Sequence, residues 1–375
     1  MVTPVQTSAN DSVGGPLEVS LTAAVVNYNA GPLLVDCVRR ALAQCEEVVV
    51  VDNASADNSI ALLGQAFAGN TNLLVVRNPT NLGFAGGCYI GTAHAMSTHV
   101  LFLNPDCLLD PRAVARLLDA IESDPAVGMV GGVLVNPDGT EQGGGRRAVP
   151  TPWRSLVRAM GLSRFAERWP KLFFDFHLHK QPLPSGPIEV EAISGACMLV
   201  RQSTLAEVGR WDDGYFLHCE DLDLCMRLTR AGRKILFVPN ARIVHYKGVC
   251  SRGRPIFVEW HKHRGMMLFY RKFFRHQYPG VLMWLVALGV WSRFAAPALF
   301  FSGRRLRKFL ARMHGCPIRG PAWGNMPPTD AVCSRSPWQS LFRRARVGAR
   351  TAARRVVRPS TALRLAGALP VGPAP

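Results

Sequence analysis

The sequence lacks the short motifs that identify several common enzyme classes. None of its 10 cysteines forms a CxxC pair, and none has the tight Cys/His spacing of a zinc site. The turn after the first expected strand, NYNAGPL, has no GxGxxG fingerprint, and no phosphate-binding P-loop occurs. These absences argue against a dinucleotide-dependent oxidoreductase and a P-loop enzyme.

Acidic residues are almost missing from the C-terminal part of the chain. Residues 1–240 contain 19 Lys and Arg against 24 Asp and Glu, a net charge of −5, whereas residues 241–375 contain 25 against 2, a net charge of +23. The two parts therefore need separate explanations. With 375 residues, 48% of them apolar, the chain can form one large α/β domain with extensions, or two domains.

The first residues, MVTPVQTSANDSVGGPLEVS, have neither the basic start nor the apolar core of a secretory signal. The cysteine positions show no tight metal-site spacing either. We therefore expect mostly buried thiols in a reducing cytosol, and a cytoplasmic location.

Short β-branched runs alternate with amphipathic stretches between Leu21 and Val135, which is typical of parallel βαβ units. We predict strands at 21–27, 47–53, 72–78, 99–106, 127–136, 188–201 and 234–246, and helices at 32–44, 57–68, 84–96, 111–123 and in the second half of 211–232. The irregular segment 146–187 is expected to be a long functional loop or a small helical insertion. The predicted fold class is α/β with a mostly parallel central sheet.

Polar residues follow four of these strands at their carboxyl ends, where ligands bind in open α/β sheets. They are Asn27, Tyr28 and Asn29, then Asp52 and Asn53, then Asn81 and Gly83 in the loop after the third strand, and finally Asn104 and Asp106. Such groups suit a nucleoside, because Asp52 can accept hydrogen bonds from ribose or base donors. Asp106 can hold a divalent cation.

Seven sequence blocks occur in order over roughly residues 20–250. They are VVNYN, VVVDNASADNS, NPTNLGFAGG, LFLNPD, ISGACMLVR, GRWDDGYFLHCEDLDLCMRL and VPNARIVHY. In this order they resemble the family 2 glycosyltransferases of the GT-A fold, especially the rhamnosyltransferase-like branch. The resemblance implies an inverting transfer from a nucleotide-activated sugar, with a divalent metal, Mg²⁺ or Mn²⁺, on the diphosphate. We expect rhamnose from dTDP-rhamnose as the donor, and a lipid-linked or polysaccharide acceptor in cell-surface glycan synthesis.

The resemblance also implies roles for particular residues. NPD takes the place of the usual DxD metal motif, so Asp106 is the expected metal ligand, with Asn104 beside it. His245 is expected to make a further metal or diphosphate contact. Asp52 is expected to bind the nucleoside, and Asp221, next to Glu220, to be the general base.

Contacts to the acceptor are assigned to Gly195, Trp211 and Asp212. Two positions depart from the branch. Gly87-Cys88 stands where Asn-Asn is common, and Trp211-Asp212-Asp213 replaces Phe-Asp-Glu.

The chemistry supports two separate carboxylates. Displacement at an anomeric carbon needs a base for the acceptor hydroxyl and a cation for the leaving diphosphate. Asp106 at a strand end and Asp221 at a helix start could face each other across a cleft. Taken alone, each pattern has a plainer interpretation: a turn for NPD, first-turn charge for Glu220-Asp221, a hydrogen-bonded His245 and a core Trp211.

Other interpretations of the whole chain stay open at this point. The donor could be a UDP-sugar, or the chain could bind a nucleotide sugar without turnover. A basic protein that binds RNA or DNA is a third class, but no nucleic-acid partner is expected because no recognised binding motif accompanies the charge.

The basic end has a different character. We divide the chain into a disordered N-terminus at 1–19, a glycosyltransferase domain at 20–250, membrane-associating helices at 251–310 and a basic, disordered tail at 311–375. The apolar stretch 279–301 is interrupted by Arg293 and Pro297 and has basic residues on both sides. We therefore expect an interfacial or re-entrant helix at the inner face of an anionic membrane. A buried core helix with a solvated basic tail is the alternative.

Overall fold

The computed structural model describes residues 19–166, 168–169, 173, 178–249 and 254–313. The expected disordered N-terminus, apart from residue 19, and nearly all of the expected basic tail lie outside the described residues.

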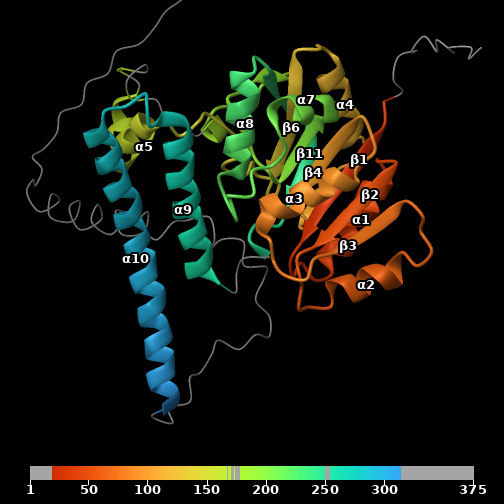
Figure 1. The fold of residues 1–375 in the computed structure, drawn as a ribbon, viewed down its shortest axis with the longest axis horizontal. Helices are drawn as coiled ribbons and strands as arrows, with labels where there is room; N and C mark the ends of the chain where they lie inside the picture. The colour runs from red at the N-terminus through yellow and green to blue at the C-terminus, as the bar shows by residue number, and fades with distance from the viewer. Residues whose placement is uncertain (1–18, 167, 170–172, 174–177, 250–253, 314–375) are drawn as a thin grey trace, which may run out of the picture. The chain divides into compact units, whose positions relative to one another are not determined.

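A nine-stranded sheet forms the centre of the domain (Figure 1). The strand order is β3-β2-β1-β4-β10-β6-β11-β5, and β8 also pairs with β11. The bounds are β1 Leu21–Asn27, β2 Glu47–Asp52, β3 Leu73–Arg77, β4 His99–Leu103, β5 Cys107–Leu109, β6 Val127–Val135, β8 Ile188–Glu189, β10 Cys197–Arg201 and β11 Lys234–His245. Strands β3, β2, β1 and β4 are parallel neighbours, as are β6 and β11, while β10 runs antiparallel between the two groups. The predicted α/β class with a mostly parallel sheet is confirmed.

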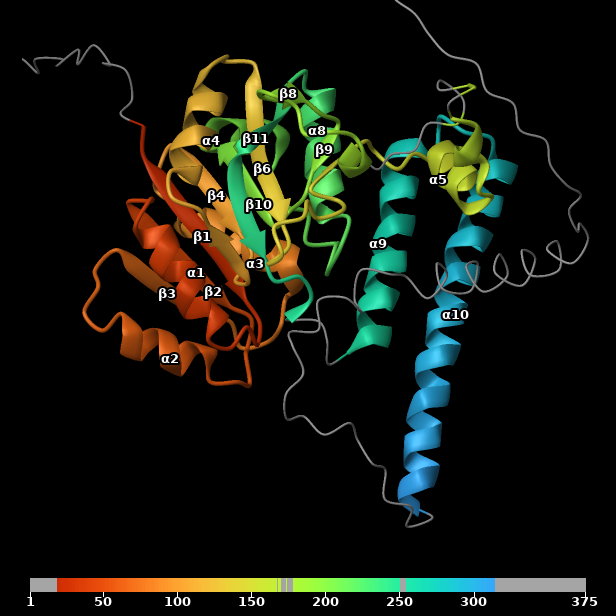
Figure 2. The same ribbon diagram turned by 180° about the vertical axis from the view of Figure 1, so that it is seen from behind.

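Helices cover both faces of this sheet. The described helices, including those that do not lie on the sheet, are α1 Leu33–Leu42, α2 Ser59–Ala66, α3 Gly83–His94, α4 Ala113–Glu122, α5 Pro152–Ala159, α7 Gln202–Val208, α8 Glu220–Arg230, α9 Pro255–Phe274 and α10 Gly280–Met313. Buried residues of α3 and α8 pack on the face seen in Figure 1, and those of α1 and α4 pack on the face seen in Figure 2. Alternate residues of β1 enter the two cores, as expected for a strand that is buried on both sides.

The single strand predicted at 188–201 is wrong. The chain there forms β8, then β9 at Ala192–Ile193, and then β10. The break before β10 has a physical reason, because backbone groups of this turn bond to other parts of the molecule. The amide of Gly195 donates to Asp221 Oδ2, and the carbonyl of Ala196 accepts from the amide of Asn104. The segment predicted as irregular, 146–187, begins with β7 at Arg146–Arg147, which pairs with β9, and continues with α5.

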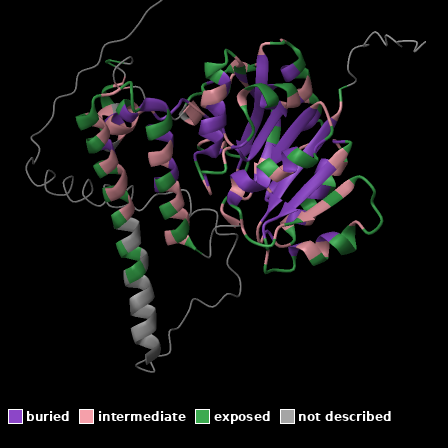
Figure 3. Cartoon of the chain, viewed as in Figure 1, coloured by how far each residue is buried: buried purple, intermediate pink, exposed green. Residues whose placement is uncertain are grey.

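Helix α9 packs against the domain through its C-terminal half. Phe269, Tyr270, Phe273 and Phe274 are at most 4% exposed and belong to the same core cluster as Trp211. These aromatic side chains are therefore covered by protein. Figure 3 shows the contrast with α10, whose described residues are largely intermediate or exposed.

Candidate functional site

The ends of β1 and β2 carry a buried pair of polar side chains. Asn27 and Asp52 are register partners, and Nδ2 of Asn27 donates to Oδ1 of Asp52 at 2.8 Å. The other Asp52 oxygen accepts from the amide of Ser55 at 3.3 Å. Asn27 is fully buried and Asp52 is 5% exposed. The predicted nucleoside residues thus form a polar floor at the carboxyl end of the sheet.

Two predicted asparagines shape the loops around this floor. Oδ1 of Asn29 accepts from the amide of Ala56 at 2.8 Å, and Oδ1 of Asn81 accepts from the amide of Gly83 at 2.8 Å. Gly83 has a φ of +79°, and a Cβ there would lie 2.2 Å from the carbonyl oxygen of Phe216. Only glycine fits this close approach, which joins the loop after β3 to the segment before α8. Tyr28 lies beside Asn29 and is half-buried.

Asn53 connects the second strand end with the same loop. Its Nδ2 donates to the carbonyl of Gly83 at 2.8 Å, and its Oδ1 accepts from Asn78 at 2.8 Å.

The departure from the family pattern at Gly87-Cys88 has a structural explanation. A Cβ at Gly87 would lie 2.5 Å from Val26, and Cys88 is fully buried. These two positions pack α3 on the sheet.

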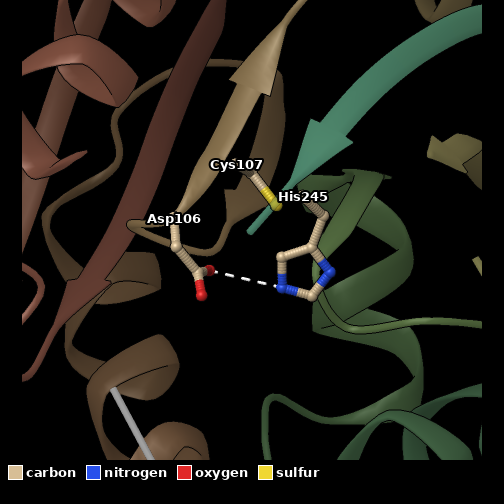
Figure 4. Close-up of side chains that lie close together, drawn as sticks. All are labelled: Asp106, Cys107 and His245. Atoms are coloured by element: carbon tan, nitrogen blue, oxygen red, sulfur yellow. Dashed lines mark ion pairs between the residues drawn. The ribbon is translucent and has the colours of Figure 1, made fainter. Parts of the chain in front are cut away.

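Asp106 and His245 lie side by side because β5 pairs with β11 (Figure 4). Oδ1 of Asp106 is 3.3 Å from Nε2 of His245, and the two residues are 3% and 7% exposed. On its other side, Nδ1 of His245 is 2.6 Å from Oε1 of Gln142. The Gln142 amide nitrogen donates to Asn136 Oδ1, so its oxygen is the acceptor and Nδ1 carries the hydrogen. The lone pair of Nε2 in the neutral ring therefore faces Asp106.

This arrangement fits a divalent cation. A carboxylate oxygen and a bare imidazole nitrogen repel each other unless a proton or a cation lies between them, and Oδ1 of Asp106 is buried without a hydrogen-bond partner among the described residues. A second hydrogen bond that fixes the far nitrogen is the usual support of a metal-binding histidine. Cys107 is close enough to join the pair, since the three ligand atoms lie within 4.8 Å of one another. However, burial raises the pKa of the Cys107 thiol well above its usual range, and its sulfur contacts the Ala196 carbonyl.

Asp221 lies in the first turn of α8 and accepts three hydrogen bonds. Its Oδ2 accepts from Nη2 of Arg147 at 2.5 Å and from the amide of Gly195 at 3.1 Å. Its Oδ1 accepts from the amide of Leu222 at 2.8 Å. Gly195 lies against Asp221, because a Cβ there would be 3.3 Å from that of Asp221. The carboxylate is therefore held in one orientation.

Glu220 has a different environment. It is 6% exposed, and no described residue forms a hydrogen bond with its Oε2. Burial raises the pKa of Glu220 to about 8, with the charge of Asp221 acting in the same direction and that of Arg147 opposing it. The two adjacent carboxyl groups thus differ in their bonding.

The turn at residues 194–196 joins the two predicted halves of the site. Asn104 donates its amide to the Ala196 carbonyl at 3.0 Å, and Gly195 donates to Asp221. The end of β4, which leads into Asp106, and the start of α8 therefore contact consecutive residues of one turn. The structure brings the expected metal ligand and the expected base to the same edge of the sheet.

The two predicted acceptor residues of the WDD segment have other contacts. Trp211 is 3% exposed and packs edge-on against Phe84 and Phe102, with ring centroids at 5.7 and 4.9 Å. Asp212 forms an ion pair with Lys272 of α9 at 2.5 Å. Trp211 presents no open stacking face in this structure, and an acceptor role for either residue stays a prediction.

Sequence reasoning missed Gln142 and Arg147. Both lie just after β6, in the region EQGGGRR that follows the turn NPDGT. The only local signal was the change from a glycine-rich turn to two adjacent arginines. Their partners are 103 and 74 residues away in sequence, so no local pattern could show the contacts.

Comparison with known proteins gives consistent matches. The family model described as glycosyl transferase family 2 matches residues 22–209. An N-acetylglucosaminyl-diphospho-decaprenol L-rhamnosyltransferase of Mycobacterium tuberculosis is 29% identical over 241 residues, which are 60% of this chain and 76% of the relative. The rhamnosyltransferase WbbL of Escherichia coli strain K12 is 28% identical over 158 residues, which are 40% of this chain and 52% of the relative.

A solved structure is also similar. The mannosyltransferase PcManGT of Pyrobaculum calidifontis, in complex with GDP-Man and Mn²⁺, is 17% identical with a TM-score of 0.47, and the match covers 78% of this chain and 84% of that one. The family match alone spans half of the chain. The chain belongs to glycosyltransferase family 2, in its rhamnosyltransferase-like branch.

Proposed function

We propose that the chain transfers rhamnose, with inversion, from dTDP-rhamnose to a lipid-linked or polysaccharide acceptor in cell-surface glycan synthesis. One observation carries this proposal. Asn104, two residues before Asp106, and Asp221 bond to consecutive residues of the same turn, so that the Asp106–His245 pair and a proton acceptor lie at one edge of the sheet. The names of the rhamnosyltransferase relatives support the choice of sugar. A UDP-sugar donor is the alternative.

Each group has a task in this reaction. Asn27, Asp52 and Asn53 form the floor on which the nucleoside rests. Asp221 takes the proton of the acceptor hydroxyl while the acceptor oxygen bonds to the anomeric carbon and the bond from that carbon to the diphosphate breaks. Asp106 and His245 would hold a divalent cation, Mg²⁺ or Mn²⁺, which when bound neutralises charge on the leaving diphosphate. Gln142 fixes the ring of His245 in the orientation that this binding requires.

The experiment that tests this function is a panel of nucleotide sugars. We expect dTDP-rhamnose to raise the melting temperature of the purified chain more than other donors do, and more with Mn²⁺ or Mg²⁺ than without. Stabilisation by a UDP-sugar alone would support the alternative donor. Stabilisation without any transfer to a range of acceptors would favour a nucleotide-sugar-binding protein.

We also propose that α10 lies on the anionic inner surface of the cell membrane, where a lipid-linked acceptor would be presented. Among the described residues, no helix combines the length and apolarity needed to cross a bilayer. Val281, Trp284, Leu285 and Leu288 are 45–74% exposed and recur at helical spacing on one face. Exposed basic side chains lie nearby, at Arg271, Arg275 and Arg293. An apolar stripe with basic neighbours is typical of a helix that binds an anionic lipid surface.

A further inference from the structure

Two adjacent arginines of β7 have opposite environments. Arg146 is 2% exposed, donates through Nε and Nη2 to Glu141 at 2.8 and 3.2 Å, and also donates to the carbonyls of Gln181 and Pro182. Arg147 donates to Asp221, its side chain is 22% exposed, and its buried Nε has no hydrogen-bond partner in the part of the chain that the structure describes. Arg146 thus holds Glu141 and the segment at 181–182 together. Arg147, beside the proposed base, keeps an unused N–H donor and is partly exposed to solvent.

The carboxylate of Asp221 does not depend on Arg147 for its position. The amides of Gly195 and Leu222 hold one oxygen each. If the guanidinium moved away, these two bonds would keep the carboxylate in place. Arg147 can therefore change partner without displacing the base.

The contact with Arg147 opposes proton transfer to Asp221. A carboxylate offers about four lone-pair sites, and Arg147 and Gly195 use both sites of Oδ2. Movement of Arg147 would open a site on Oδ2 for the incoming proton.

We propose that Arg147 is a positioning residue that changes partner, from Asp221 in the ligand-free chain to a phosphate oxygen of a diphosphate-bearing substrate in the complex. This inference rests on the function proposed above. A guanidinium matches phosphate oxygens with two parallel N–H donors, and Arg147 has an unpartnered Nε beside the Nη2 that now bonds Asp221. The substrate thereby releases the base at the moment when it is needed. The diphosphate could belong to the nucleotide donor or to a lipid-linked acceptor.

A thermodynamic cycle on the full chain tests the exchange through binding of inorganic pyrophosphate, measured by calorimetry. Arg147→Met should weaken binding. Asp221→Asn removes the competitor for Arg147 and should tighten binding about tenfold, a gain that should vanish in the Arg147→Met background. The control is Glu220→Gln at pH 9, which removes a neighbouring charge that Arg147 does not contact and should give a smaller gain.

The outcomes separate this inference from the proposed function. An equal gain in pyrophosphate affinity from Asp221→Asn, with Arg147 present or replaced by Met, would reflect simple loss of negative charge. That result would overturn the proposed change of partner by Arg147. If the wild-type chain transfers sugar but the gain is absent, the exchange is wrong and the function stands. If the wild-type chain binds neither pyrophosphate nor nucleotide sugars, both proposals fail.

Two further probes identify the source of the diphosphate. The same cycle with dTDP reports on the donor, and with farnesyl diphosphate on a lipid-linked acceptor. Coupling between Arg147 and Asp221 with only one of these probes assigns the diphosphate to that substrate. Coupling with neither would contradict the proposal.

A KM-against-kcat split gives a readout that a purely structural role of Arg147 would not produce. If Arg147 leaves Asp221 for the diphosphate, Arg147→Met should raise the KM for the diphosphate-bearing substrate by a larger factor than it lowers kcat, because the amides of Gly195 and Leu222 still hold the base. Arg147→Lys keeps the charge and should raise KM less. A fall in kcat with an unchanged KM in Arg147→Met would contradict the proposal.

Discussion

Lys272 of α9 lies 2.6 Å from Oδ1 of Asp223, a carboxylate that has no solvent exposure and stands two residues after Asp221. The same ammonium group bonds Asp212, and a Cβ at Gly265 of α9 would lie 2.5 Å from the carbonyl oxygen of His218. These contacts fix α9 to the helix that carries the proposed base. The helix is therefore part of the catalytic domain, although its sequence is basic and rich in aromatics.

Loss of this ion pair should destabilise the domain. Lys272→Met leaves the buried Asp223 with Arg227 as its one cationic partner among the described residues, and we expect unfolding to become easier by about 1–3 kcal/mol, because Oδ1 of a buried carboxylate loses its charged partner. Urea denaturation measures the change. The matched control on the same helix is Lys262→Met, whose pair with Glu259 is partly exposed and should contribute less than about 1 kcal/mol. Equal effects of the two variants would remove the special role of Lys272.

Removal of α9 should destabilise the domain more than loss of the Lys272 ion pair does. A chain that ends after Tyr246 lacks Phe269, Tyr270, Phe273 and Phe274, all of which are buried in the main core cluster. We expect such a chain to aggregate and to show no cooperative thermal unfolding, because their loss uncovers a large apolar surface. A soluble product that unfolds cooperatively would show that the contacts of α9 are dispensable.

The proposed metal site predicts a graded series of affinities. Asp106→Ala should abolish tight Mn²⁺ binding, and Gln142→Ala should weaken it about 10–100-fold, because the ring of His245 loses its support. Electron paramagnetic resonance of free Mn²⁺ measures both effects without turnover. Cys107→Ala is the control, since its sulfur already contacts the Ala196 carbonyl and Mn²⁺ affinity should stay unchanged. Unaltered binding in Asp106→Ala would remove Asp106 from the site.

Glu220 should make the stability of the domain depend on pH. Its pKa is raised by burial from 4.5 to about 8, so the folded state holds a proton that the unfolded state releases between these values. The contribution of Glu220 to the free energy of unfolding is therefore present in full below about pH 4.5 and is lost as the pH rises through about 8. Urea midpoints at pH 5.5, 7 and 8.5 should therefore fall in the wild-type chain and fall less in Glu220→Gln. An identical decline in both proteins would place the titration elsewhere.

The exposed face of α10 predicts binding to anionic vesicles. Trp284→Glu puts a charge into the stripe and should reduce co-sedimentation with vesicles of anionic lipid several-fold, because an apolar contact is replaced by a charge that the surface repels. High salt should release the wild-type chain only partly, since salt screens the basic residues and leaves the apolar contact intact. Met96→Glu, at a side chain that is 90% exposed outside α10, is the control. If the wild-type chain stays in the supernatant at low salt, the membrane proposal is wrong.

Local sequence patterns predicted the strands of the sheet well. They did not predict the bonds between segments that are distant in the sequence. Strand β1 has the bounds predicted for it, because its β-branched run is continuous and ends at a polar Asn27. The prediction of a single strand at 188–201 was wrong because Gly195 and Ala196 bond to groups that are distant in the sequence. No local hydrophobic periodicity reveals such bonds. The same reason hid the contact of Arg147 with Asp221. The helices expected at 251–310 were assigned to a membrane, but an apolar helix face gives the same pattern whether it meets lipid or, as in α9, protein.

The most direct test of the central claim is the configuration of the product formed from dTDP-rhamnose in the wild-type chain and in Asp221→Asn. Nuclear magnetic resonance of the isolated glycoside reports the anomeric configuration, and the initial rate reports the role of the base. We predict an inverted linkage from the wild-type chain, and a rate about 10²–10⁴-fold lower in Asp221→Asn with donor binding preserved. A product with retained configuration, or an undiminished rate in Asp221→Asn, would contradict it.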